Sequence, residues 1–139
     1  MQPITPYLTV NGAEKALEFY QNAFGATDIF RHPDEDGKRL FHARMTINGG
    51  VVMMSDDYSK DHGGPAAPTP EHPAPVAVAI TYDSPERVDA TFRQAVAAGA
   101  NGAVEPADMF WGDRFAIVVD PFGHRWMLNA PLHAPNRLA

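Results

Sequence analysis

Residues 4–10 alternate between apolar and polar side chains, the pattern of a β-strand with one buried face. Apolar positions from Ala16 to Phe24 are then spaced three and four residues apart, as on one face of a helix, and Gly25 supplies a stop. The preceding Asn11-Gly-Ala-Glu14 resembles a helix capping box. The pattern predicts three further strands, over residues 26–32, 40–47 and 51–56.

The same order of elements starts again at residue 76. Residues 76–82 alternate, Asp83-Ser-Pro-Glu86 repeats the capping motif, and apolar positions at helical spacing lead to Gly99. Two strands are expected around the turn Asp120-Pro-Phe-Gly123, over residues 115–119 and 124–129. The offset between the two passes is 72 residues at first and 73 or 74 later. This agreement favours an internal duplication.

The duplication predicts an α+β fold built from two βαβββ modules, whose mixed sheets form a cup with the helices on its convex side. The modules are expected over about 1–57 and 76–130, within a single domain of residues 1–139. Between them, residues 58–75 are rich in proline and are expected to lack regular structure, and residues 131–139 form a tail.

Composition narrows the function classes. The 139 residues carry a net charge of −6, which argues against nucleic acid as a partner because phosphate binding needs clustered Lys and Arg. The absence of cysteine excludes disulfides and thiolate chemistry and fits a reducing compartment, so a cytoplasmic location is expected. No apolar run is long enough to span a membrane.

Two motifs identify a family resemblance. The stretch Asn11-Gly-Ala-x-x-Ala-Leu-Glu-Phe-Tyr20 and the stretch Trp111-Gly-Asp-Arg…Asp-Pro-Phe-Gly-His124 resemble the vicinal oxygen chelate superfamily, which includes glyoxalase I, extradiol dioxygenases and bleomycin and fosfomycin resistance proteins. The PhnB-like branch is the most similar. The resemblance implies a homodimer and a small-molecule ligand.

Enzymes of this superfamily hold a divalent metal with His, Gln or Glu from the first and last strands of each half. The matching positions here are Thr5, Ala77, Met54 (or Met53 after a one-residue slip) and Met127. None of these side chains suits Zn²⁺, Ni²⁺ or Fe²⁺. A metal cofactor is therefore disfavoured, and no other cofactor is expected.

Several residues are candidates for ligand binding. Tyr7 is expected to line the cup, and His42 shares a strand face with Arg44 and Thr46, although the repeat aligns His42 with Phe115, which is assigned to the core. The remaining five histidines are expected in surface or turn positions, and Asp56 and Asp57 as solvated turn residues. Met54 and Met127 are adaptable apolar groups that either form the floor of the cup or fill the core.

Trp111, Asp113 and Arg114 form the other candidate group. Phe115 and Ile117 are assigned to the core face of their strand, and neighbouring side chains of a strand point to opposite faces, so Arg114 is expected to point into the cup. There, Arg114 and Trp111 would clamp a ligand that carries a ring and an anionic group. The alternative is that Asp113 and Arg114 pair with each other or with the backbone.

Two functions remain open at this point. The first is a small-molecule binding protein of the glyoxalase and bleomycin resistance type that lacks the usual metal ligands. The second is an enzyme: a metal-dependent lyase, isomerase or dioxygenase with unexpected ligands, or a metal-free catalyst using His42, Arg44 or Arg114.

Overall fold

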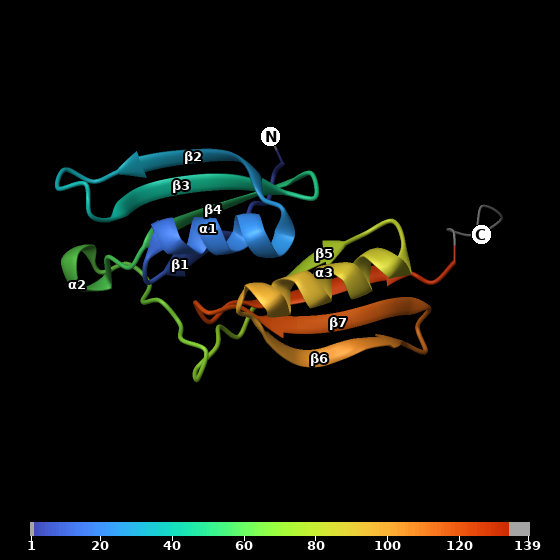
Figure 1. Cartoon of the computed structure of the whole chain (residues 1–139). Coiled ribbons are helices and arrows are strands. Elements are labelled where there is room, and N and C mark those ends of the chain that lie inside the picture. Colours follow the sequence, from blue (N-terminus) through green and yellow to red (C-terminus); the bar gives the residue numbers. More distant parts are fainter. Residues whose placement is uncertain (1, 134–139) are drawn as a thin grey trace.

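The computed structural model describes residues 2–133, and within them the chain forms two four-stranded sheets and three helices (Figure 1). In chain order the elements are β1 (Tyr7–Val10), α1 (Ala13–Phe24), β2 (Thr27–Pro33), β3 (Leu40–Ile47), β4 (Gly50–Asp56), α2 (Ser59–His62), β5 (Ala77–Thr81), α3 (Pro85–Ala98), β6 (Asn101–Asp108), β7 (Asp113–Val119) and β8 (Arg125–Pro131). The predicted α+β architecture of two βαβββ modules is confirmed.

The two sheets have the same topology. Their strand orders are β1-β4-β3-β2 and β5-β8-β7-β6, with the first and last strand of each module parallel and the other pairs antiparallel. Tyr7 lies opposite Met53 in the first sheet, and Ala79 lies opposite Met127 in the second. Equivalent residues are thus 72 positions apart in the first strands and 74 apart in the last strands, as the repeat predicts.

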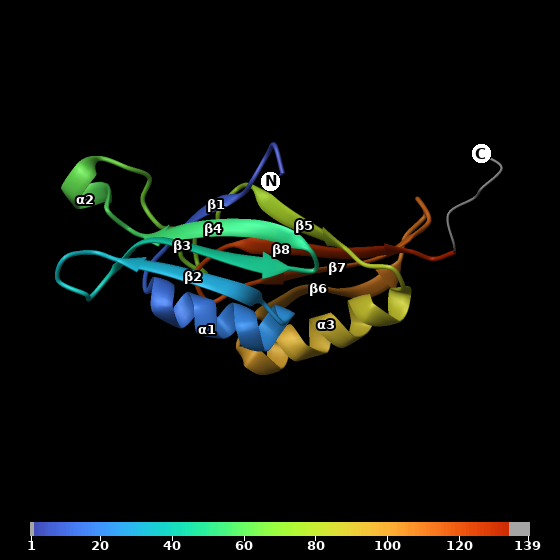
Figure 2. The same ribbon diagram turned by 90° about the horizontal axis from the view of Figure 1, so that it is seen from above.

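Both long helices cover the same side of the two sheets and contact each other (Figure 2). The strand residues beneath them are almost fully buried: Leu8, Val10, Met45, Val52, Met54, Ile80, Ala116, Val118, Trp126 and Leu128. Burying these apolar side chains supplies the main stabilisation of each module, since a buried side chain of this size contributes roughly 1.5–3 kcal/mol. The opposite, concave side of the sheets is left for other contacts.

The start of α1 is held by a residue from the last strand of its module. Gly12 is the N-cap residue and has no side-chain cap, so the predicted role of Asn11 is wrong. Instead Oδ1 of Asp56 accepts hydrogen bonds from the backbone N–H groups of Gly12 and Ala13, at 2.8 and 3.0 Å, and Oδ2 accepts from Leu40 at 2.8 Å. Asp56 is 6% exposed, which corrects the expectation of a solvated turn residue.

A buried polar cluster joins the two modules. Asp120, fully buried in the turn before β8, accepts hydrogen bonds from the Tyr20 hydroxyl and from the Trp126 indole, the latter at 2.8 Å. Nε2 of His124 lies 2.8 Å from the carbonyl oxygen of Thr9. Of the surface or turn positions expected for this histidine, His124 takes the turn, where it is 7% exposed rather than at the surface.

The proline-rich segment contains more structure than predicted. It includes the one-turn helix α2, and Asp57 anchors the segment by accepting hydrogen bonds from the N–H groups of Ser59 and Ala67, both at 2.8 Å. Further on, the Ala74 N–H donates to the carbonyl of Gly123 at 2.8 Å. Gly123 has a φ of 89°, and a Cβ there would lie 2.6 Å from the Thr69 nitrogen. The segment therefore packs against the turn that holds Asp120.

No helix within residues 2–133 combines the length and the apolar composition that a membrane crossing requires.

Candidate functional site

The concave faces of the two modules differ in chemistry. On this face of the first module, Tyr7 of β1 and Arg44 of β3 both lie opposite Met53 of β4. His42 of β3 lies on the same face, next to Tyr7. At the equivalent positions the second module carries Ala79, Phe115, Ile117 and Met127. The first face thus has hydrogen-bonding and titratable groups where the second has apolar ones. Because His42 and Phe115 both lie on the concave side, the repeat and the strand pattern do not conflict at His42.

A cavity of about 610 Å³ opens on the concave face of the first module. We name it the concave pocket; it is lined by Tyr7, Thr9, Phe41, His42, Ser55, Asp56, Tyr58, His62, Gly64 and Pro65. Its floor comes from β1, β3 and β4, and one side is formed by the segment around α2. The volume is in the range of small-molecule sites. Most of the lining is aromatic or otherwise apolar.

Tyr7 and His42 form a hydrogen-bonded pair in this pocket. The Tyr7 hydroxyl lies 2.9 Å from Nδ1 of His42, and the ring centroids are 5.6 Å apart. With His42 neutral and its proton on Nε2, the hydroxyl donates to Nδ1. Next to the pocket, the Phe30 ring centroid lies 6.3 Å from that of His42, and the Arg44 guanidinium lies 5.2 Å from the Phe30 centroid. The pocket therefore offers a paired hydroxyl and imidazole among flat apolar rings.

Tyr58 and His62 form the side wall contributed by the proline-rich segment. Their rings stack with centroids 5.6 Å apart, and the Tyr58 hydroxyl donates a hydrogen bond of 2.8 Å to Oδ2 of Asp34. Desolvation of the phenol, together with the hydrogen bond to the Asp34 carboxylate, raises the pKa of Tyr58 to about 12. Tyr58 therefore stays a neutral donor at every physiological pH.

Phe41 completes this wall. A bulge between β2 and β3 sets His32 opposite His42 but Pro33 opposite Leu40. Leu40 is consequently buried, whereas Phe41 is half-exposed and contacts Tyr58 edge-on at 5.5 Å.

Arg114 does not point into the cup. It shares its strand face with Ala116 and Val118, beneath α3, and its guanidinium binds Asp89 of α3 and Asp108 of β6, each with a contact of 2.9 Å. These carboxylates raise the pKa of Arg114 above its usual range, through hydrogen bonds to Asp89 first and then Asp108. The prediction failed because the strand face with the larger apolar side chains, Phe115 and Ile117, was assigned to the core. The face that is buried under α3 instead carries Arg114, Ala116 and Val118.

The neighbours of Arg114 are also placed differently from the clamp hypothesis. Trp111 is half-exposed in the β6–β7 turn and packs edge-on against Phe115 at 5.7 Å. Asp113 begins β7 opposite Pro131, and Arg114 pairs with other carboxylates, so the alternative of an Asp113–Arg114 pair is wrong as well. The structure does not bring Trp111 and Arg114 together on one face.

The two methionine candidates lie on different sides of their sheets. Met54 is fully buried under α1, whereas its neighbour Met53 lies opposite Tyr7 and Arg44 on the concave side. The one-residue slip considered for this strand is therefore the correct register. Met127 is half-buried opposite Ala79 and Ile117, on the concave side of the second module, as expected.

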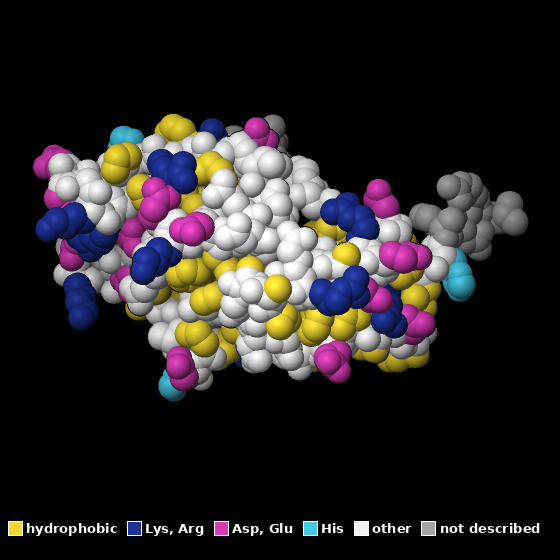
Figure 3. All heavy atoms as spheres, viewed as in Figure 1, with side chains coloured by type: hydrophobic (Ala, Val, Ile, Leu, Met, Phe, Trp, Pro, Cys, Tyr) yellow, Lys and Arg dark blue, Asp and Glu magenta, His cyan; other side chains and the backbone are white. Residues whose placement is uncertain are grey.

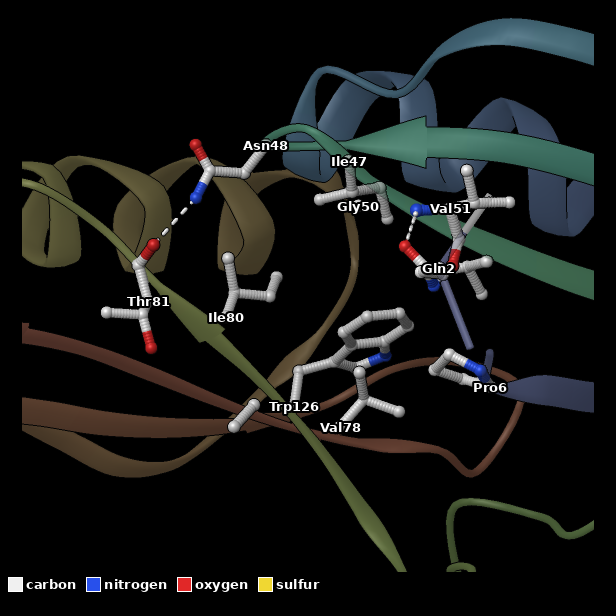
Figure 4. A pocket seen from close by; sticks show the side chains of 12 residues that line it. Gln2, Pro6, Ile47, Asn48, Gly50, Val51, Val78, Ile80, Thr81 and Trp126 are labelled. Carbon is white, nitrogen blue, oxygen red and sulfur yellow. Dashed lines mark hydrogen bonds between the residues drawn. The ribbon is translucent and has the colours of Figure 1, made fainter. Parts of the chain in front are cut away.

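A second cleft, of about 280 Å³, lies between the two modules (Figure 4). Asn48 closes one end by donating a 2.7 Å hydrogen bond to the carbonyl of Thr81. At the other end the Gln2 side chain pairs with both the N–H and the carbonyl of Val51, at 3.1 and 2.8 Å. Trp126 and the aliphatic side chains of β5 lie along the cleft (Figure 4). Since its polar groups already pair with each other, this cleft is the poorer candidate.

The sequence model of the Glyoxalase/Bleomycin resistance protein/Dioxygenase superfamily matches residues 2–128. The chain belongs to this superfamily. An uncharacterized protein of Mycobacterium bovis is 41% identical to it over 134 residues, which cover 96% of this chain and 86% of that protein.

Solved structures of the superfamily share the fold. The PhnB protein of Bacillus cereus is 27% identical with a TM-score of 0.65, covering 93% of this chain and 99% of that one. A glyoxalase/bleomycin resistance protein/dioxygenase from Nocardioides is 25% identical with a TM-score of 0.65, covering 100% and 91%. The predicted family resemblance, including the PhnB-like neighbour, is confirmed.

The residues of this superfamily member do not fit the metal that the family's enzymes hold. The concave positions of the first and last strands carry Tyr7, Met53, Ala79 and Met127, and Thr5 lies before β1. Within residues 2–133 no three His, Asp or Glu side chains converge in a way that could hold a metal ion. Thioether, methyl and phenol groups are poor ligands for Zn²⁺ or Fe²⁺.

The sequence did not single out Phe41, Tyr58 or His62 as site residues, because two of them lie in a segment expected to be irregular. The signal available was the placement of two rings four residues apart in Tyr58-Ser-Lys-Asp-His62, which one helical turn brings onto the same side.

Proposed function

We propose that this superfamily member is a small-molecule binding protein whose ligand occupies the concave pocket of the first module. The observation that supports this is a cavity of about 610 Å³ whose aromatic walls surround the Tyr7–His42 pair. Such walls favour a ligand with a flat, partly apolar body, and the pair supplies a polar group to orient it. The proposal includes no bound metal, since the expected ligand positions carry other side chains.

A second candidate function is supported by one specific contact. The hydroxyl and imidazole of Tyr7 and His42, 2.9 Å apart, are suited to moving a proton without a metal. Such a pair would act on a proton next to a carbonyl group. Its test is deuterium exchange at the methyl group of acetophenone in D₂O, which Tyr7→Phe should abolish and which the binding protein alone would not catalyse.

The proposed binding is tested by calorimetric titration with indole, benzyl alcohol and benzoate. His42→Ala should weaken the best of these probes about tenfold, equivalent to roughly 1.4 kcal/mol, because the hydrogen-bonded pair and a ring wall are lost. Phe115→Ala, at the equivalent position of the second module, is the matched control and should leave affinity unchanged. Loss of binding in the Phe115 variant alone would place the site in the second module and overturn the assignment.

The proposal also includes a homodimer in the cytoplasm. The absence of cysteine supports a reducing compartment. The outer strands β2 and β6 and the half-exposed aromatic side chains of the concave side support self-association, which would cover edges and apolar surface.

A further inference from the structure

A third cavity, of about 580 Å³, lies at the end of the molecule formed by the β2–β3 hairpin and α2. It shares Phe41, Tyr58 and His62 with the concave pocket and lies on the other side of these rings. We name it the hairpin pocket; it is lined by His32, Pro33, Asp34, Glu35, Asp36, Arg39, Phe41, Tyr58, Asp61 and His62. The proposed function does not use it.

Four aromatic rings form one wall of the hairpin pocket. Phe41 makes edge-on contacts with three of them, at centroid distances of 5.5 Å to Tyr58, 6.4 Å to His62 and 6.5 Å to His32. Tyr58 and His62 stack on each other. Ring faces arranged around a space are a structural basis of organic-cation recognition, since the negative face of a ring attracts a cation.

Charge at this pocket has one dominant sign. Four carboxylates line it, from Asp34, Glu35, Asp36 and Asp61, against the single guanidinium of Arg39. On the surface around the pocket, Lys and Arg side chains lie among the Asp and Glu side chains at this end of the molecule (Figure 3). In addition, Oδ1 of Asp34 is buried and accepts no hydrogen bond from any residue between 2 and 133.

The position of Arg39 shows that the ring wall and its carboxylates hold a cation. Its guanidinium lies over the Tyr58 ring, 4.2 Å from the centroid, with Nη2 at 2.6 Å from Asp61 and Nε at 3.7 Å from Asp34. The side chain is 40% exposed, so its place over Tyr58 is open to solvent. A planar or quaternary cation of similar size would meet the same ring and the same carboxylates.

We propose that the hairpin pocket binds an organic cation, an ammonium or guanidinium compound with apolar substituents, which replaces the Arg39 guanidinium over Tyr58 and beside Asp61. A bare metal ion is not the expected occupant, because no metal-binding set of three side chains converges within residues 2–133. The assignment does not rest on the concave pocket, which lies across the ring wall and would take a flat apolar ligand.

The test uses choline and its uncharged isostere 3,3-dimethylbutan-1-ol, each titrated into ¹⁵N-labelled protein at low salt. Choline should shift the amide signals of residues 33–41 and 58–63 and bind at least tenfold more tightly than the alcohol. Indole, the probe for the concave pocket, should instead shift signals around Tyr7 and Ser55. Failure of either site is therefore visible separately from failure of the other.

Variants give the sharper result. Arg39→Gln removes the internal competitor and should tighten choline binding several-fold, whereas Asp61→Asn should weaken it several-fold and the remote control Asp83→Asn should leave it unchanged. Equal affinity for choline and the alcohol would overturn the proposal, as would an Arg39→Gln protein that binds choline no better. If Arg39→Gln does not fold, Arg39→Lys, a smaller competitor without the planar fork, should still tighten binding, and unchanged affinity would count against the site.

Discussion

The contact between the two modules depends on Asp120. It is fully buried, and its carboxylate receives hydrogen bonds from Tyr20 of the first module and from Trp126, Phe122 and His124 of the second. A buried carboxylate is stable only while such donors are present, and removing one leaves part of its desolvation penalty uncompensated. Removing a single donor to Asp120 should therefore destabilise the contact between the modules strongly.

Tyr20→Phe should lower the free energy of unfolding by about 1–3 kcal/mol, because one oxygen of Asp120 then loses a donor in the interior. Thermal melting measures the loss, and Tyr7→Phe, which removes a hydroxyl at the exposed Tyr7–His42 pair, is the matched control with a much smaller effect. Equal melting temperatures for the Tyr20 variant and the parent protein would contradict this role.

The same contact predicts an alkaline limit. Burial first, and then the Asp120 charge, raise the pKa of Tyr20 well above 10.0. Because the folded-state pKa is raised, the stabilisation is complete below the ordinary tyrosine pKa and is lost as the pH rises through the folded-state value.

At the scale of elements, the segment around α2 depends on one carboxylate. Asp57 holds the N–H groups of Ala67 and Ser59, and these hydrogen bonds, that of Ala67 first, lower the pKa of Asp57 below its ordinary value of 3.8. For a lowered folded-state pKa, the stabilisation is complete above the ordinary value and is lost as the pH falls through the lowered one. The wall formed by Tyr58 and His62 should therefore loosen only in acid.

An acid titration followed by NMR measures this. The Ala67 amide signal should move with a midpoint below the ordinary Asp value, and the ring signals of Tyr58 and His62 should shift with it. Asp57→Asn should remove the Ala67 transition, while the substitution should leave the position of the Leu40 amide signal, whose N–H donates to Asp56, unchanged at neutral pH. A midpoint at the ordinary Asp pKa would show that the hydrogen bond to Ala67 does not persist in solution.

The elements themselves could be predicted better than the direction of individual side chains. Hydrophobic periodicity and the glycine stops sufficed for both long helices and for every strand except β6, which only the repeat implied. Side-chain direction failed at Arg114 and at Met54, since one residue of register moves a side chain to the other face of a sheet. Asp56 as a cap and the bulge at Phe41 arise from contacts between distant segments, which local sequence does not contain.

For the whole molecule, the duplication was the most informative feature of the sequence because it implied both the number of modules and the order of elements along each module. The site required the folded structure, since Tyr7, His42 and Tyr58 come together from β1, β3 and the segment between the modules. The predicted homodimer remains to be measured.

Light scattering at micromolar concentration should give about twice the chain mass of 15.2 kDa. The physical reason is that outer strands and half-exposed Phe30 and Trp111 are costly to leave in water. Replacing Trp111 with Lys should shift the mass toward one chain if its surface is part of the contact. A single-chain mass for the parent protein at every concentration tested would contradict the expectation.

The unequal concave faces also have a meaning in evolutionary terms. After a duplication the two copies start with the same side chains, yet here one copy carries Tyr7, His42 and Arg44 where the other carries Ala79, Phe115 and Ile117. An apolar face can exchange one carbon side chain for another at little cost, whereas a hydrogen-bonded pair is lost when either member changes. If the ligand occupies the concave pocket, as proposed, the second module tolerates changes of detail, whereas a new ligand specificity needs coordinated changes in the first module.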